Sequence, residues 1–145
     1  MKKNHTNPIE QFKGNSNPKI LVQRADRLGD LVLALPVIEQ LLFHFKQAKL
    51  YLLCSNRNVK LIEQWGDIAG YFVFDIHTNP TKAEKESFIY DIAKEKFDLY
   101  ISLWNHPFYQ SLGKKAAINL SFGLYRSPLS YYFFSHVIHA KWNNI

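Results

Sequence analysis

A short polar segment between an apolar run and an apolar helix holds the residues best suited to chemistry in this sequence. It contains Arg24, Arg27, Gly29 and Asp30. The two guanidinium groups can make charge-assisted contacts with phosphate or carboxylate, and Gly29 can take a positive φ or let a ligand approach the backbone. A helix that starts at Asp30 offers free amide donors to an anion. The segment therefore predicts a binding site for an anionic ligand.

The same residues also have purely structural interpretations. Asp30 is a good N-cap for the helix, and Arg24 and Arg27 can be solvated or paired with Asp26. The segment contains no GxGxxG pattern, and the chain contains no GxxxxGK[ST] pattern. A P-loop is therefore excluded, and we do not expect a dinucleotide site of the usual kind.

A second group of candidates follows the predicted strand 98–103. Asn105 and His106 lie where ligands bind in an open α/β sheet, past the carboxyl end of a strand, and we predict that both contact a substrate. A turn histidine that makes a local hydrogen bond is the alternative. Trp104 can stack on a sugar ring or be a partly buried aromatic side chain at a strand end. The six histidines are scattered, so we expect no metal site.

Alternating strands and helices position these residues. Short apolar runs predict buried strands, and apolar residues at spacings of three and four predict helices, with a bend or restart where Pro36 deletes a backbone donor. The predicted strands are 20–22, 50–54, 71–76, 98–103 and 117–122. One predicted helix starts at Asp30, and three more cover 58–65, 82–96 and 108–117. We predict an α/β fold: an open parallel, Rossmann-like sheet of about five strands with flanking helices.

The two ends of the chain are harder to interpret. Residues 1–18 show no periodicity, and we expect a mobile leader followed by one domain over 19–145. The aromatic residues 131–134 have three possible roles: they enter the core, cover a further domain, or lie on a membrane face, in that order of preference.

Composition limits the class of protein. A net charge of +6 favours anionic partners, but no basic block suggests a nucleic-acid tail, so we expect no nucleic-acid partner. The single cysteine, Cys54, has no partner for a disulfide. No stretch approaches the ~20 apolar residues of a membrane span, and the N-terminus lacks the apolar core of a signal peptide. A cytoplasmic location is the simplest expectation.

The run from Arg24 to Leu41, RADRLGDLVLALPVIEQL, resembles the N-terminal signature of glycosyltransferase family 9, which includes the lipopolysaccharide heptosyltransferases. That signature is an apolar strand, an arginine, a short loop, Gly-Asp, an apolar stretch, a proline and a helix. Here Gly29, Asp30 and Pro36 match it, and the spacing of LYLLC, YFVFDI and DLYISL follows the order of that family's first domain. The resemblance covers about residues 19–140.

The resemblance implies the N-terminal half of a GT-B glycosyltransferase, which holds the acceptor while a C-terminal half holds the nucleotide sugar. Asp30 matches the proposed general base, which would take a proton from an acceptor hydroxyl in an inverting transfer. Arg24, Arg27 and Gly29 would shape the site. The donor would be a nucleotide sugar, with heptose as one candidate for the transferred sugar, and no metal or other cofactor would be needed. The acceptor would be a lipopolysaccharide core or related surface glycan, or a lipid-linked glycan.

Further implied partners are a separate chain that supplies the donor site and peripheral contact with the inner face of the inner membrane. The alternative is a non-catalytic or truncated α/β module that binds an anionic glycan or a phosphate ligand.

Overall fold

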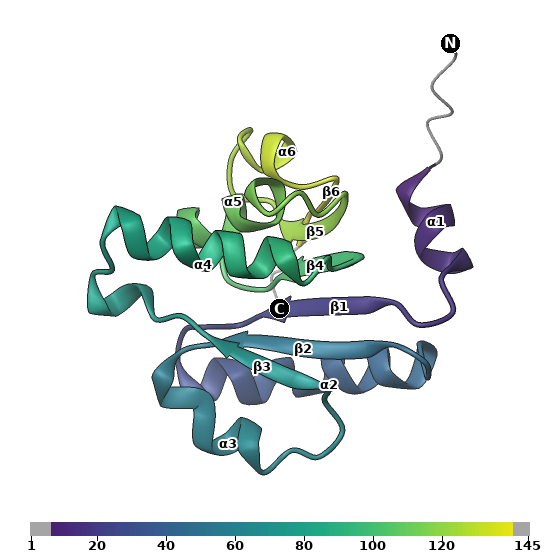
Figure 1. Cartoon of the computed structure of the whole chain (residues 1–145), viewed down its shortest axis with the longest axis horizontal. Coiled ribbons are helices and arrows are strands. Elements are labelled where there is room, and N and C mark those ends of the chain that lie inside the picture. Colours follow the sequence, from purple (N-terminus) through teal and green to yellow (C-terminus); the bar gives the residue numbers. More distant parts are fainter. Residues whose placement is uncertain (1–6, 141–145) are drawn as a thin grey trace, which may run out of the picture.

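The computed structural model describes residues 7–140, which contain one open sheet of six strands in the order β3-β2-β1-β4-β5-β6 (Figure 1). Every neighbouring pair is parallel. The predicted Rossmann-like α/β fold is confirmed, with one strand more than the five expected. The strands are Lys19–Gln23 (β1), Lys49–Cys54 (β2), Gly70–Val73 (β3), Leu99–Ser102 (β4), Leu120–Leu124 (β5) and His136–Ile138 (β6).

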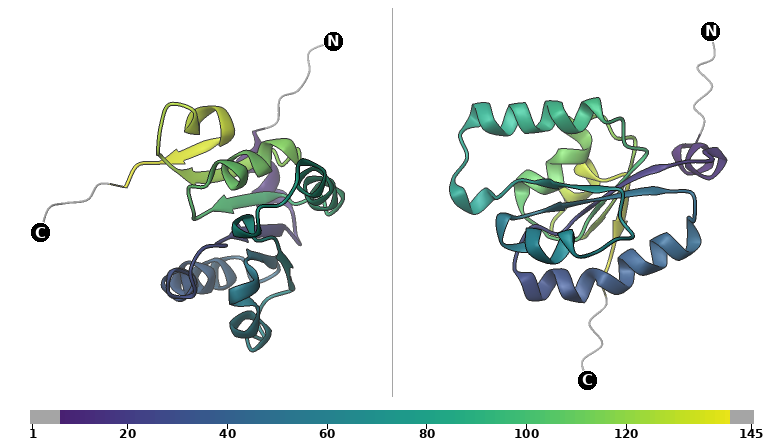
Figure 2. Two further views of the ribbon diagram at one scale, coloured as in Figure 1. Left: turned by 90° about the vertical axis from the view of Figure 1, so that its left-hand side faces the viewer. Right: turned by 60° about the horizontal axis from the view of Figure 1, so that its bottom comes forward.

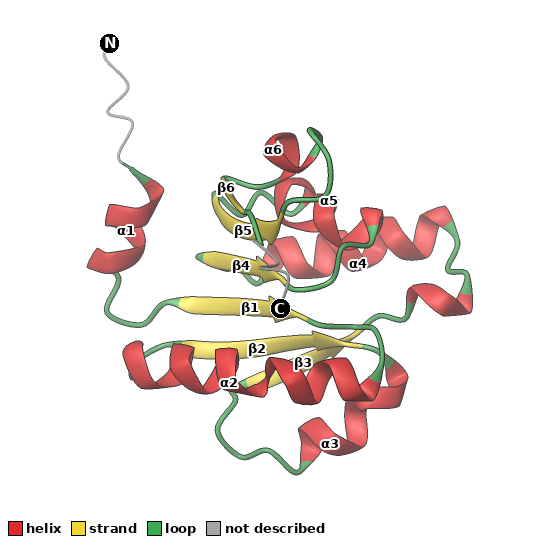
Figure 3. Ribbon diagram, turned by 180° about the vertical axis from the view of Figure 1, so that it is seen from behind, coloured by secondary structure: helices red, strands yellow, loops and turns green. Residues whose placement is uncertain are grey.

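Helices cover both faces of the sheet, as Figures 2 and 3 show. Ile62 of α3 packs with the α2 residues Leu31 and Ile38 in one apolar cluster, whereas Ile92 of α4 packs with Leu112 of α5 in the other. The helices are Pro8–Gly14 (α1), Leu28–His44 (α2), Val59–Glu63 (α3), Lys82–Lys94 (α4), Pro107–Lys115 (α5) and Ser130–Phe133 (α6), with 3₁₀ turns at Asn56–Asn58 (η1) and Ile76–Thr78 (η2). The sheet therefore separates two cores, as a parallel sheet requires.

Helix α1 corrects the expectation that no ordered element precedes residue 19. The Asn7 side chain accepts a hydrogen bond from the amide of Ile9, and a proline opens the helix. Phe12 is buried, and its ring meets that of Phe45 edge to face at 5.1 Å. One aromatic contact thus anchors a helix too short to show a periodicity. Residues 1–6 of the predicted leader lie outside the described residues.

Helix α2 begins earlier than predicted. Its N-cap is Arg27, so Asp30 occupies the third helical position instead of the cap. A carboxylate in the first turn still interacts favourably with the helix dipole. The helix is one continuous element through Pro36, so the restart that we considered there is absent.

The chain after β5 forms α6 and the unpredicted strand β6. Phe134 is buried and Phe133 is half-buried, whereas Tyr131 and Tyr132 are exposed. The first interpretation of the aromatic segment, burial in the core, therefore holds for Phe134.

The α2 face of the sheet carries a groove over β4, β5 and β6. The crossovers after β3, β4 and β5 pass over the opposite face. Within residues 7–140, α1 and part of α2 are therefore the only helices that flank these strands on this side (Figure 3). The groove encloses about 450 Å³ and is lined by side chains that include Ile101, Phe122 and Ile138.

The ring of Phe134 packs directly on the backbone of Gly123 in β5. A Cβ atom at position 123 would lie 2.2 Å from Phe134 Cε2, far inside van der Waals contact. We predict that Gly123→Ala lowers the free energy of unfolding by about 1–3 kcal/mol, because a core this tightly packed must shift to admit a methyl group.

Gly29→Ala is the matched control, since a Cβ there meets nothing within 4 Å. Its free energy of unfolding should be unchanged or raised by less than about 1 kcal/mol. Urea unfolding followed by circular dichroism measures both. Equal stabilities for the two variants would contradict the packing of Phe134 on β5.

Candidate active site at the carboxyl ends of β1 and β4

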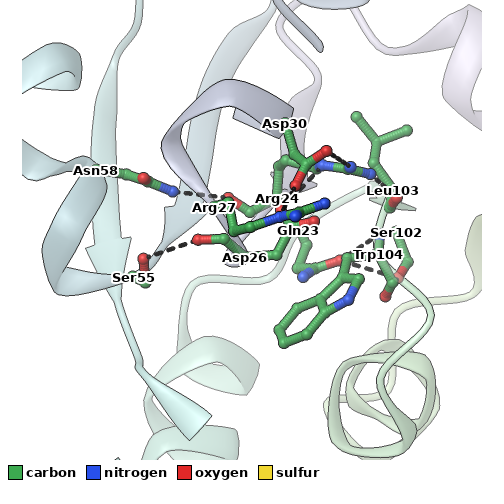
Figure 4. Close-up of polar contacts among 10 residues, drawn as sticks. All are labelled: Gln23, Arg24, Asp26, Arg27, Asp30, Ser55, Asn58, Ser102, Leu103 and Trp104. Carbon is green, nitrogen blue, oxygen red and sulfur yellow. Dashed lines mark hydrogen bonds and ion pairs between the residues drawn. The ribbon is translucent and has the colours of Figure 1, made fainter. Parts of the chain in front are cut away.

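The topological switch point lies between β1 and β4. The crossovers from β1 proceed toward β3 on one side, and the chain then returns to β4 on the other side of β1. Connections leave neighbouring strands in opposite directions at such a point, which is where ligands bind in open α/β sheets. The segment 24–30 and the turn after β4 meet here (Figure 4).

Arg24 spans the switch point. Its Nη1 donates to the carbonyl oxygen of Leu103, directly after β4. Its Nε lies 3.0 Å from Oδ1 of Asp26, and its Nη2 lies 3.3 Å from Oδ1 of Asp30. The side chain is only 20% exposed. The guanidinium is thus fixed on several sides and has a structural role as well as a possible binding role.

Asp30 lies beyond the carboxyl end of β1, and its carboxylate is held between two arginines. Oδ1 faces Arg24, and Oδ2 accepts a hydrogen bond from Nε of Arg27 at 2.9 Å. The hydrogen bond from Arg27 is the main cause that lowers the pKa of Asp30. Desolvation opposes it, whereas the charges of both arginines and a side-chain hydrogen bond with Asp26 add to it. Asp30 is therefore ionised at neutral pH, and 19% of its side chain reaches solvent.

Arg27 is the exposed side of this arrangement. Its side chain is 83% exposed, so its ion pair with Asp30 is screened by water. The groove over β4, β5 and β6 is lined by other residues. Oδ2 of Asp30 therefore lies at an open edge of the sheet, with the exposed side chain of Arg27 beside it.

Gly29 differs from its expected role. It lies in the first turn of α2, and no glycine in the described part of the chain has a positive φ. Its missing side chain leaves open space beside Asp30. The prediction of a special backbone angle is wrong, whereas close approach of a ligand stays a prediction.

Asn105 and His106 lie after β4 with local partners. Asn105 Oδ1 accepts from Gln110 at 3.4 Å, and His106 Nδ1 caps α5 by accepting from the Phe108 amide at 3.2 Å. Burial and the neighbouring charges of His77, Lys85 and Arg126 lower the pKa of His106. The alternative interpretation of a locally bonded turn histidine thus describes this structure, and substrate contact by either residue stays a prediction.

Trp104 belongs to an aromatic group beside the same edge. Its ring lies 5.6 Å from that of His77 and 5.3 Å from that of His106. His77 comes from the η2 turn after β3. The turns after β3 and β4 therefore meet next to the segment 24–30.

The sequence analysis missed Gln23 and did not predict that Asp26 is buried. Gln23 is fully buried, and its Oε1 accepts from Ser102 Oγ at 3.0 Å and from the Trp104 amide at 3.2 Å. Asp26 is 8% exposed, and its main-chain oxygen accepts from Ser55 Oγ at 3.3 Å. A usable signal existed: these polar residues stand at or just past the ends of apolar strands, which meet at one edge of a parallel sheet.

Within residues 7–140, no group of three or more His, Cys, Asp or Glu side chains is arranged to hold a metal ion. No helix in this range combines the length and apolar character needed to cross a membrane.

The lowered pKa of Asp30 gives a direct prediction. Because Arg27 is its largest cause, Arg27→Gln should raise the pKa of Asp30 toward its ordinary value. Folding lowers this pKa, so the stability that Asp30 contributes is present above the unfolded-state pKa and is lost as pH falls through the folded-state pKa. In Arg27→Gln these two pKa values should lie closer together. The pH range over which this stability is lost should therefore be narrower.

Carbon-13 NMR of the side-chain carboxyls measures the titration. Arg57→Gln, at an exposed arginine in the η1 turn after β2, is the control and should leave the Asp30 titration in place. An unchanged Asp30 pKa in Arg27→Gln would show that this ion pair does not form in solution.

Known proteins match this chain in fold but not in sequence. No family model matches the sequence, and no curated protein matches it. Solved structures do match. A family 9 glycosyl transferase from Veillonella parvula DSM 2008 superposes with a TM-score of 0.71 at 19% identity, covering 87% of this chain and 36% of that one.

Two E. coli enzymes match in the same way. ADP-heptose lps heptosyltransferase II gives a TM-score of 0.69 at 18% identity, covering 82% of this chain and 34% of that one. Heptosyltransferase WaaC with ADP-2-deoxy-2-fluoro heptose gives 0.72 at 17% identity, covering 86% and 44%. This chain thus spans less than half the length of these proteins. Over that span, it has the fold of family 9 glycosyltransferases and heptosyltransferases, as the sequence resemblance implied.

Proposed function

We propose that this chain is the acceptor-side half of an inverting glycosyltransferase, with Asp30 as the general base. The observation that carries the proposal is the ionised carboxylate of Asp30, held at the carboxyl edge of a sheet whose fold matches sugar-transferring enzymes. A carboxylate within hydrogen-bond reach activates a hydroxyl, which is otherwise a poor nucleophile.

The proposed reaction is a single displacement. The acceptor oxygen attacks the anomeric carbon of the nucleotide sugar, its proton passes to Asp30, and the nucleoside diphosphate leaves with the electrons of the broken bond. The lowered pKa of Asp30 suits this order of events. Its carboxylate is always ionised near pH 7, and it needs to accept the proton only when bond formation has made the attacking oxygen acidic.

The two oxygens of Asp30 have different tasks in this proposal. Arg24 is part of the folded edge and keeps hold of Oδ1, which fixes the orientation of the carboxylate. Arg27 is exposed and releases Oδ2 when the acceptor arrives. Oδ2 is therefore the atom that meets the acceptor hydroxyl, and the released guanidinium is free to contact an anionic group on the acceptor.

The acceptor that we propose is a lipopolysaccharide core or related surface glycan, since two of the matching structures are heptosyltransferases, one of them described as acting on lps. Asn105, His106 and the open space at Gly29 would line its site. The donor would be a nucleotide sugar held by a C-terminal half or a separate chain, without a metal or other cofactor. The chain would work in the cytoplasm against the inner membrane, where such acceptors lie.

A second candidate is a non-catalytic module that binds an anionic glycan or phosphate. The exposed Arg27 at the N-terminus of the 17-residue helix α2 favours it, because helix amides and a guanidinium together attract anions. This module would bind its ligand without supporting transfer.

Asp30→Asn distinguishes the two. The chain is combined with the donor-binding C-terminal half of a heptosyltransferase, and transfer from ADP-heptose to inner-core lipopolysaccharide is followed by loss of donor. We expect a fall in turnover of about 10²–10⁴-fold, the usual contribution of a general base, with acceptor binding retained.

Asp91→Asn is the control, because it removes the same charge from an exposed site on α4. Its turnover should equal that of the unmodified chain. Normal turnover by Asp30→Asn in a folded complex would refute the base assignment, and acceptor binding without any transfer by the unmodified chain would favour the second candidate.

A further inference from the structure

The outward face of α2 is apolar although it is exposed. A helix on the surface of a globular protein normally has one apolar stripe and a charged or polar opposite face. The inward face of α2 is apolar, and its buried residues are Leu31, Ala34 and Ile38. The exposed large apolar side chains of the same helix are Leu28, Val32, Leu33, Val37 and Phe43. The helix therefore has a second apolar face that the described chain does not bury.

Four of the exposed side chains form a stripe along the helix. Leu28 and Val32 are four positions apart, and so are Leu33 and Val37, which places the members of each pair above one another. Leu33 is the most exposed of them, at 77%. In Figure 3, α2 lies in front of the sheet, and no element of the described chain covers its near side. The stripe is therefore open to a partner.

The stripe continues into the groove over β4, β5 and β6. Val37 lines this groove and also a shallow hollow of about 710 Å³ beside α2. Leu41 and Phe45 line both as well. The apolar surface thus extends from the outer side of α2 onto the uncovered strands. A contiguous exposed apolar surface marks a contact with another protein or with a membrane.

The charges around this surface suit an anionic partner. Lys46 follows the end of α2, with its Nζ 5.9 Å from the centroid of the Phe43 ring, and Lys13 of α1 lines the groove. Among the ion pairs of residues 7–140, none involves either lysine. Glu39 is the one exposed acid of α2. Cations beside an apolar helix face are typical of a helix that lies in the interface of an anionic bilayer.

We propose that α2 and the groove beside it bind the surface of an anionic phospholipid bilayer. The stripe lies among the lipid headgroups, and Lys13 and Lys46 contact lipid phosphates. The purpose of this contact rests on the proposed function, since the proposed acceptor belongs to a membrane lipid. Asp30 is in the first turn of the same helix, so the bound chain holds its proposed base close to the bilayer and to the acceptor.

The other two partners suit this surface less well. Two copies that met through this face would bring together chains that each carry a net charge of +6, which repel one another. A donor-side half must face Asp30 at the carboxyl edge of the sheet. The groove instead extends to α1 and to Leu99, the first residue of β4, at the opposite ends of the strands.

A fluorescent label on the stripe tests the contact directly. Cys54 is fully buried, and burial raises the pKa of its thiol to about 12, so a maleimide dye on the Leu33→Cys chain reacts with the new thiol. The vesicles contain phosphatidylethanolamine and phosphatidylglycerol with brominated acyl chains. We expect the emission of the dye to shift to the blue and to be quenched by the bromine.

Tyr90→Cys is the matched control. Tyr90 is a large side chain that is 65% exposed on α4, which packs on the opposite face of the sheet. A dye there should keep its emission when the same vesicles are added. Should Leu33→Cys fail to fold, Phe43→Cys gives the same readout. No change at position 33, or equal quenching at positions 33 and 90, overturns the proposal.

Lys46→Gln tests the cationic part of the surface. Its binding to the anionic vesicles, measured by co-sedimentation, should be about fivefold weaker, the effect of one cation near an anionic leaflet. Lys115→Gln, at an exposed lysine of α5, should bind like the unmodified chain. Equal binding by the two variants overturns the role of Lys46. A lipid-free dimer that shields the dye at position 33 from iodide overturns the membrane contact in favour of a second copy.

Vesicle binding needs no sugar transfer, so its outcome is separate from that of the proposed function. Asp30→Asn should bind the vesicles as the unmodified chain does. Vesicle binding together with normal turnover by Asp30→Asn would reject the base and retain the membrane surface. A dye at position 33 that never meets lipid, in a chain whose turnover depends on Asp30, would retain the base and reject the membrane surface.

Discussion

The bridge that Arg24 makes across the switch point is the interaction on which the candidate site depends. The chain leaves β1 and β4 in different directions after the backbone hydrogen bond from the Leu103 amide to the Gln23 carbonyl, at 3.0 Å. Arg24 joins them through the Leu103 carbonyl and at the same time faces two carboxylates. The position of Asp30 is therefore set by tertiary structure as well as by the helix that carries it.

Gln23 reinforces this bridge from inside the sheet. Its amide oxygen accepts from Ser102 and from the Trp104 amide, while its amide nitrogen and one oxygen of Asn58 are buried without hydrogen-bond partners. Most buried polar groups in native proteins are paired. These unpaired groups are concentrated at the edge that also carries two acids and two arginines.

The sequence predicted the elements that show a local pattern and missed the elements that depend on contacts between residues far apart in the chain. The runs 20–22, 50–54 and 98–103 were recognised as strands because a strand buried on both faces is apolar throughout. Helix α1 and strand β6 are short, and each depends on a tertiary contact, Phe12 with Phe45 for the one and pairing with β5 for the other. No periodicity in seven or three residues can reveal such contacts.

The site follows the same rule. Arg24, Arg27 and Asp30 are neighbours in sequence, and the structure brings them together as expected, although Asp30 occupies the third helical position and Gly29 has an ordinary backbone. The contact of Arg24 with Leu103 joins residues 79 positions apart, and so does that of Gln23 with Ser102. The pairing of Asp26 with Arg24 was considered only as an alternative, because burial of the acid depends on packing that the sequence does not display.

The most direct measurement is a structure of this chain bound to an inner-core lipopolysaccharide oligosaccharide. The account predicts an acceptor hydroxyl about 2.6–3.2 Å from Oδ2 of Asp30, with Arg27 turned away and Arg24 still on Oδ1. An oligosaccharide bound elsewhere, or one bound beside an Asp30 still closed by Arg27, would contradict it.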